Sequence, residues 1–160
     1  MMGHFLEELR AGMEFDLGTY HFTRDNVLRF ARTYDPQPFH TDDVAAEASH
    51  FGRLAASGWH TAAAWMSCFV ATDARLRQER EARGETAARL GPSPGLRNLK
   101  WIKPVYPLDT IKYHLVVTSA RPLATRTGWG MGTMSTDGMN QHGEHVFSFD
   151  GMVMVPRLPA

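Results

Sequence analysis

The chain has 160 residues, of which 43% are hydrophobic and 21% are charged, and its 17 basic and 17 acidic side chains balance at pH 7 with histidine neutral. These values are typical of a soluble globular protein, and we expect residues 1–160 to form a single domain. The balanced charge gives no electrostatic reason to expect a nucleic-acid or membrane partner, so neither is predicted.

The first part of the chain predicts one strand and two helices. Apolar and polar residues alternate over 13–22, which indicates a strand. Thr23 is a suitable N-cap for a helix over 24–33, and Pro36 would end that helix. A second, shorter helix is predicted over 42–48, with Asp42 as its candidate N-cap.

A long helix is predicted over 59–80, with Ser57 just before it as a candidate N-cap. Its apolar positions nearly surround it as far as Asp73, which indicates a largely buried helix, whereas its charged last turns are expected in solvent. The only cysteine, Cys68, lies in this apolar run and is expected to be a buried, reduced thiol. Residues 82–95 are predicted to form a mobile loop.

The second half of the chain is rich in β-branched, aromatic and methionine residues, in segments bounded by Pro, Gly or polar turns. A buried helix followed by such segments predicts an α+β fold in which an antiparallel sheet wraps around a central helix. The predicted strands are 96–102, 109–119, 125–136 and 146–155. The N-terminal region lacks the pattern of a leader peptide and no apolar run is long enough to cross a membrane, so we expect a cytoplasmic protein.

Asp35 and His40 are the first candidate catalytic residues. They lie five positions apart on a segment that Pro36 and Pro38 stiffen, because each proline fixes its own φ and restricts the residue before it. A rigid segment can hold a carboxylate and an imidazole in one orientation, as general acid–base chemistry requires. The alternative is that these prolines only end a helix and form a turn.

Gly58 is the third candidate catalytic residue. It begins the predicted long helix, and the first turn of a helix offers unpaired backbone N–H groups at the positive end of the helix dipole. Such a site suits a developing oxyanion. The alternative is that Ser57 and Gly58 serve only to cap the helix.

Two segments of the chain resemble the MaoC-like hydratase/dehydratase family, relatives of the (R)-specific enoyl-CoA hydratases. They are Phe30-Ala31-Arg32-Thr33-Tyr34-Asp35-Pro36-Gln37-Pro38-Phe39-His40 and Phe51-Gly52-Arg53-Leu54-Ala55-Ala56-Ser57-Gly58-Trp59-His60-Thr61. The turn Pro104-Val105-Tyr106-Pro107-Leu108-Asp109-Thr110 resembles a third family motif. The usual Gly before the Asp and Asn before the Pro are replaced by Tyr34 and Gln37, and the usual Gly of the third motif by Leu108.

The resemblance implies a hot-dog fold, in which an antiparallel sheet wraps around a long central helix, and a homodimer or a higher homo-oligomer. It further implies reversible addition of water to a 2-enoyl-CoA, giving a 3-hydroxyacyl-CoA. Asp35 and His40 would act together on one water, and the Gly58 N–H would bind the thioester carbonyl oxygen. Coenzyme A is then part of the substrate, and no other cofactor is predicted.

Four more residues are predicted to bind substrate: Ser57, Tyr34, Phe39 and Trp59. Ser is strongly preferred at helix N-caps, so capping is favoured over substrate contact for Ser57. Tyr34 and Phe39 are expected to pack around the site without reacting, and His60 is expected to be a packed or hydrogen-bonded histidine.

Two alternative functions remain at this level. A non-catalytic acyl-CoA-binding protein could keep the fold and the thioester pocket. A hot-dog thioesterase is less favoured, because such enzymes usually carry a carboxylate on or near the central helix and none lies between Trp59 and Thr72. No metal site is predicted, since His142, Glu144 and His145 lie in a turn without further ligands around them.

Overall fold

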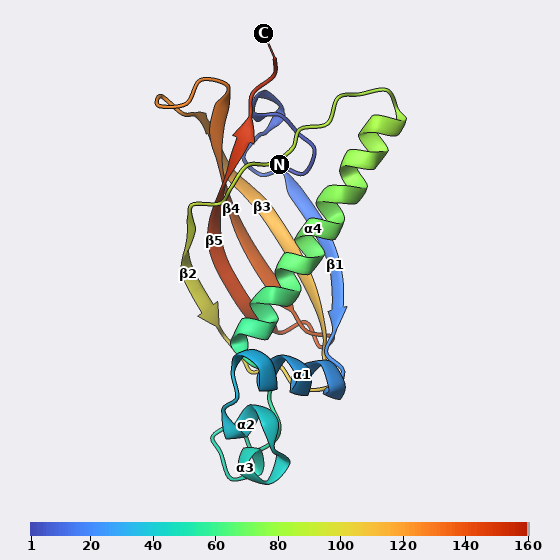
Figure 1. Cartoon of the computed structure of the whole chain (residues 1–160), viewed down its shortest axis with the longest axis vertical. Coiled ribbons are helices and arrows are strands. Elements are labelled where there is room, and N and C mark those ends of the chain that lie inside the picture. The colour runs from blue at the N-terminus through green and yellow to red at the C-terminus, as the bar shows by residue number, and fades with distance from the viewer. Residues whose placement is uncertain (160) are drawn as a thin grey trace.

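The computed structural model describes residues 1–159, and its main feature is a long helix, α4 (Gly58–Ala82), lying along one face of an antiparallel sheet (Figure 1). Within these residues five strands form the sheet, in the order β1-β3-β4-β5-β2. This arrangement confirms the predicted α+β hot-dog fold. The strands are β1 (Glu14–His21), β2 (Gly95–Trp101), β3 (Thr110–Pro122), β4 (Trp129–Met139) and β5 (His145–Pro156).

The core lies between α4 and the sheet. Alternate residues of β3 and β4 are buried, as expected for strands with one face covered. Polar groups of the core are paired: the Trp65 indole N–H donates to Thr136 Oγ1 at 2.7 Å, and the Tyr113 hydroxyl donates to the Thr61 carbonyl at 2.9 Å. Because a lost buried hydrogen bond is costly, these two bonds fix the register of α4 on the sheet.

Three short helices lie beyond the first turn of α4 (Figure 1): α1 (Arg24–Tyr34), α2 (Pro38–Thr41) and α3 (Asp43–Glu47). Thr23 caps α1, and Asp42 caps α3, which confirms the predicted starts of both helices. The sequence did not predict α2. Its Pro38 occupies the first helical turn, where a missing N–H costs nothing.

The boundaries of two strands differ from the prediction. The strand predicted over 125–136 begins only at Trp129 and continues to Met139, and β3 extends beyond Ser119 to Pro122. The polar residues after 136 looked like a turn. Asp137, however, lies on the outward side of the alternating strand, where a carboxylate faces solvent at no cost.

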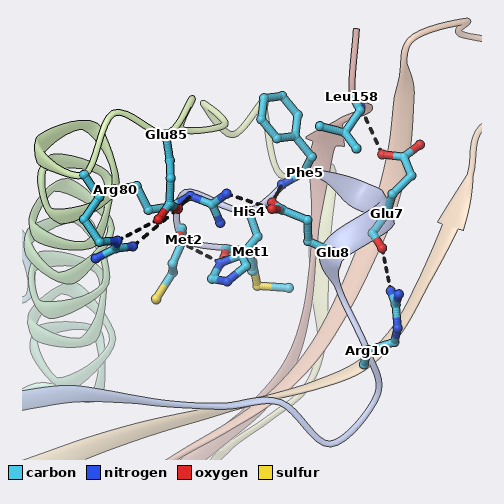
Figure 2. Close-up of polar contacts among 11 residues, drawn as sticks. Met1, Met2, His4, Phe5, Glu7, Glu8, Arg10, Arg80, Glu85 and Leu158 are labelled. Carbon is cyan, nitrogen blue, oxygen red and sulfur yellow. Dashed lines mark hydrogen bonds and ion pairs between the residues drawn. The ribbon is translucent and has the colours of Figure 1, made fainter. Parts of the chain in front are cut away.

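The N-terminal segment covers the end of α4, which the sequence did not predict (Figure 2). It contains a short 3-10 helix, η1 (Leu6–Glu8), and its first two methionines are fully buried. Glu8 receives a hydrogen bond of 2.7 Å from the Arg80 guanidinium. The last turn of α4 is therefore partly covered, contrary to the prediction that it projects into solvent. No helix in the described part of the chain could cross a membrane.

Candidate active site

Asp35 and His40 are brought together by the end of α1 and the turn of α2. Asp35 is the C-cap of α1, and His40 lies on α2, two residues after Pro38. The His40 Nε2 atom lies 3.5 Å from Asp35 Oδ2, and the exposed fractions of the two side chains are 6% and 17%. This distance exceeds that of a good hydrogen bond, so the two groups face one another across a small gap.

The tautomer of the His40 ring follows from the hydrogen bond that its Nδ1 atom makes. Nδ1 lies 2.8 Å from the Ala55 carbonyl oxygen, which can only accept, so Nδ1 carries the hydrogen. In the neutral imidazole, Nε2 is then an acceptor and faces the carboxylate of Asp35, a second acceptor. A molecule lying to one side of this contact, in the adjoining cavity, could donate a hydrogen bond to both atoms.

Asp35 is held by two side-chain donors. The Ser57 hydroxyl donates to Oδ2 at 2.6 Å and the Gln37 amide donates to Oδ1 at 2.8 Å. Burial acts to raise the pKa of the Asp35 carboxyl. The bonds from Ser57 and Gln37 and the charge of a protonated His40 act against burial, and the resulting pKa lies below its ordinary value.

Gly58 is the first residue of α4, and Ser57 is its N-cap. The Ser57 oxygen accepts from the Trp59 N–H at 3.2 Å, which confirms the capping role predicted for it. Among residues 1–159 no acceptor is found for the Gly58 N–H. This free donor lies at the positive end of a 25-residue helix, where an anionic oxygen is stabilised.

A cavity of about 560 Å³ joins these groups. Asp35, His40 and Gly58 line it together, so the structure gathers all three predicted catalytic residues in one place. Of the predicted substrate-binding residues, Phe39 and Trp59 also line the cavity, and Ser57 is fully buried behind it. The remaining lining residues are Gln37, His50, Phe51, Ala56, Trp101, Ile102, Lys103, Pro104 and Tyr106.

Tyr34 does not lie in this cavity. Its side chain is 73% exposed and lines a separate cavity of about 360 Å³, together with Arg29 and His60. His60 packs on Phe30 with parallel rings 4.6 Å apart and lies 3.3 Å from the Tyr20 hydroxyl. This confirms the prediction of a packed histidine.

The environment of His60 keeps its ring neutral. Burial, and secondly the charge of Arg29, lower the pKa of His60 to about 4. Near pH 7 the ring therefore carries no charge and is poorly suited to deliver a proton.

Sequence reasoning missed the residues that β2 and the following turn contribute. Trp101 is the last residue of β2 and Tyr106 follows shortly after, and both line the cavity with Asp35. Trp101 and Tyr106 are far along the chain from Asp35 and His40, so the sequence alone did not indicate that they share a site. The antiparallel pairing of β2 with β5 places them beside the start of α4. Arg53 lies over the Tyr106 ring, 3.7 Å from its centre.

A smaller, apolar cavity of about 170 Å³ lies between α4 and the sheet. Trp59 lines both this cavity and the larger one, so the two adjoin at that side chain. The other lining residues are Ala62, Trp65, Met66, Phe69, Ser93, Gly95, Leu96, Leu99, Met134, Phe147, Phe149, Gly151 and Val153.

The described residues contain no group of three metal-ligating side chains. His142 and Glu144 lie in the turn before β5 and His145 begins that strand, and the carboxylate of Glu144 forms an ion pair with Lys103.

Comparison with known proteins finds similarity to MaoC-like proteins. A family model described as "MaoC like domain" matches residues 8–137. Over 152 residues the chain is 27% identical to the uncharacterized protein YdeM of Bacillus subtilis (strain 168), covering 95% of this chain and 99% of YdeM.

Two solved structures are similar over nearly the whole chain. The MaoC-like dehydratase from Rhodospirillum rubrum is 35% identical with a TM-score of 0.81, covering 99% of this chain and 100% of that one. The R-hydratase PhaJ1 from Pseudomonas aeruginosa is 23% identical with a TM-score of 0.66, covering 96% of this chain and 86% of that one. At that identity the second likeness shows a shared fold.

Proposed function

Because the chain belongs to the MaoC-like dehydratase family, we propose that it is an acyl-thioester hydratase/dehydratase. The proposed reaction is reversible addition of water to a 2-enoyl-CoA, which gives a 3-hydroxyacyl-CoA. One observation carries the proposal: Asp35 Oδ2 and His40 Nε2 face each other at 3.5 Å, in the same cavity as the free Gly58 N–H.

In the proposed mechanism, one water lies between Asp35 and His40 and donates a hydrogen bond to each. As one of the pair takes a proton, the water oxygen bonds to C3 of the enoyl group. The π electrons of the C2–C3 double bond move toward the thioester, and negative charge develops on the carbonyl oxygen beside Gly58. The pair then returns a proton to C2, so one molecule of water is added in all. Dehydration follows the same steps in reverse.

The small apolar cavity suggests the size of the acyl group. An engineered apolar cavity of about 150 Å³ in another protein accommodates benzene, a six-carbon guest. The cavity here has a volume of about 170 Å³, and Trp59 borders both it and the reaction cavity. We therefore place the acyl tail there and propose short acyl groups, with about four to six carbons beyond the double bond.

We also propose a homodimer formed through β2. This strand lies at one edge of the sheet, and an unpaired edge is a template for a second strand. Apolar side chains are exposed on β2 and on the neighbouring surface of α4, including Leu96 and Met66. A second copy of the chain would cover these side chains and pair the free edge.

The test is hydration of crotonyl-CoA, followed as loss of the enoyl-thioester absorbance. We expect turnover by the wild type and a loss of about 10²- to 10⁴-fold in kcat for Asp35→Asn and for His40→Gln, because each removes a positioned acid–base group. Asp43→Asn is the matched control, since Asp43 is a carboxylate on α3 that pairs with Arg24 outside the cavity.

Turnover by Asp35→Asn near the wild-type rate would contradict the proposed mechanism. Binding of enoyl thioesters across several chain lengths, with no turnover by the wild type, would favour the alternative of a non-catalytic acyl-CoA-binding protein. Release of free coenzyme A would favour a thioesterase. That route has less support, because the residues of α4 that line the cavity, Gly58 and Trp59, include no carboxylate.

A further inference from the structure

The indole of Trp101 lies directly against Gly58. A Cβ atom placed on Gly58 would be 2.5 Å from Trp101 Nε1 and Cε2 and 2.8 Å from Cδ1. Real Cβ atoms do not come this close to other atoms, so only glycine allows the indole to take this position. The three nearest atoms are Nε1 and its two ring neighbours, so the nitrogen side of the indole is the part beside the Gly58 backbone.

An irregularity in β2 directs Trp101 toward α4. The pairing of β2 with β5 shifts register between Arg97 and Lys100, and Asn98 has a φ of 53°. Such bulges often re-aim a side chain next to a functional site. After the bulge Trp101 pairs with Phe147, which is fully buried under α4, so the two side chains lie on the same face of the sheet.

The Trp101 N–H is an available donor in the reaction cavity. Indole nitrogen can only donate, and no acceptor for it is found in the described part of the chain, whereas the Trp65 N–H is bonded to Thr136. The Trp101 side chain is 45% exposed and lines the cavity that contains Asp35. The cavity thus has two free N–H donors next to each other, one from Gly58 and one from Trp101.

We propose that Trp101 is a catalytic residue whose Nε1–H donates a second hydrogen bond to the thioester carbonyl oxygen, beside the Gly58 N–H. This inference rests on the proposed hydratase function. A carbonyl oxygen accepts two hydrogen bonds, and the charge that develops on it during water addition strengthens both. Trp101 therefore lowers the barrier to water addition and dehydration alike.

The kinetic test is Trp101→Phe, which keeps an aromatic ring beside Gly58 and removes the N–H. Because the lost bond is stronger in the transition state, we expect kcat and kcat/KM to fall together by about 10- to 100-fold, somewhat below the loss typical for removal of one oxyanion-hole side-chain donor. Trp129→Phe is the matched control and should keep wild-type kinetics, since Trp129 begins β4 and does not line the cavity. Wild-type kcat in folded Trp101→Phe overturns the inference.

A spectroscopic test decides the role of Trp101 without turnover. Crotonyl-CoA carrying ¹³C at the thioester carbonyl is added to Asp35→Asn, and the carbonyl resonance is measured in the complex. We expect a downfield shift on binding that is reduced when Trp101→Phe is added to the same chain. An unchanged shift overturns the inference.

A further readout needs no substitution at Trp101. With ¹⁵N-labelled Asp35→Asn, the indole N–H signal assigned to Trp101 among the four should move downfield on binding crotonyl-CoA, and a shift of the Trp59 signal, whose residue also lines the cavity, does not count. If the Trp101 signal does not move, the inference fails. If the wild type binds the thioester without hydrating it, the proposed function fails while the carbonyl and indole shifts still decide whether Trp101 contacts the substrate.

Discussion

Ser57 serves the site in two ways through one hydroxyl group. Its oxygen accepts from the Trp59 N–H and so begins α4, while its hydrogen is donated to Asp35. The oxyanion donor and the acid–base pair are therefore linked through a single side chain. A change at Ser57 should alter the start of the helix and the pKa of Asp35 at once.

We expect Ser57→Ala to move the acid limb of the kcat/KM profile to higher pH. Loss of the donated hydrogen bond removes one of the contacts that lower the pKa of Asp35, so its carboxylate protonates at a higher pH. Loss of the cap should also lower the free energy of unfolding by about 1 kcal/mol. The measurements are a pH–rate profile and a urea titration.

Thr23→Ala is the control for this prediction, because Thr23 caps α1 in the same way without touching Asp35. It should lose similar stability and keep the wild-type acid limb. An acid limb that moves equally in both variants would show that helix capping, and not the bond to Asp35, sets the pKa.

At the scale of elements, the apolar cavity between α4 and the sheet limits the length of acyl group that is proposed to bind. Phe69 stacks on Trp65 with ring centres 5.1 Å apart, and both line the apolar cavity. The proposed limit on chain length therefore depends on side chains of α4 some three turns from Gly58. Their volume decides how far a tail can enter.

We expect Phe69→Ala to shift preference toward longer enoyl thioesters. The ratio of kcat/KM for 2-dodecenoyl-CoA, which has nine carbons beyond the double bond, to that for 2-octenoyl-CoA, which has five, should rise about tenfold or more, since each methylene in an apolar pocket is worth about 1–3 kcal/mol. Leu76→Ala is the control, because Leu76 packs against the core without lining this cavity. An unchanged ratio would place the acyl tail elsewhere.

The sequence predicted elements with strong local signals and missed those that depend on distant partners. Thr23, Ser57 and Asp42 each mark a helix start through their own side chain, and all three cap as expected. The end of β4 was misplaced because outward polar residues of a strand resemble a turn. The N-terminal cover of α4 has no local signal, since it depends on Arg80, far along the chain.

The residues of the candidate site also differ in whether a local sequence signal or a distant partner determines their position. Asp35, His40 and Gly58 could be proposed from sequence because they lie on short, rigid segments with a family motif. Gln37 is part of the sequence motif, but its hydrogen bond to Asp35 could be recognised only in the three-dimensional structure. Trp101 could not be predicted, because a strand bulge and the register of β2 on β5 determine where its side chain points.

At the scale of the whole molecule, the sheet has two edges, and β2 is the one next to the active site. Exposed apolar residues are found there and on the adjacent surface of α4, among them Leu96 and Met66. Partner docking at this edge would border both cavities. Assembly and catalysis are thus expected to be connected.

We expect Leu96→Lys to break the proposed dimer, because a lysine on an edge strand opposes strand pairing. Light scattering after size-exclusion chromatography should give twice the mass of one chain for the wild type and the mass of one chain for the variant. Leu158→Lys is a matched control: the two leucines are 51% and 50% exposed, but Leu158 lies after β5. A dimeric Leu96→Lys would place the interface elsewhere.

The two facing acceptors of Asp35 and His40 also bear on which nucleophile can be used. A molecule that satisfies both must bring two hydrogens and keep a lone pair for carbon. Water has them, whereas an alcohol or a thiol has one. Enoyl thioesters react readily with thiols in solution, because a thiol is a stronger nucleophile than water. This arrangement favours water over a thiol through the number of hydrogens that each can donate, and not through the size of the nucleophile.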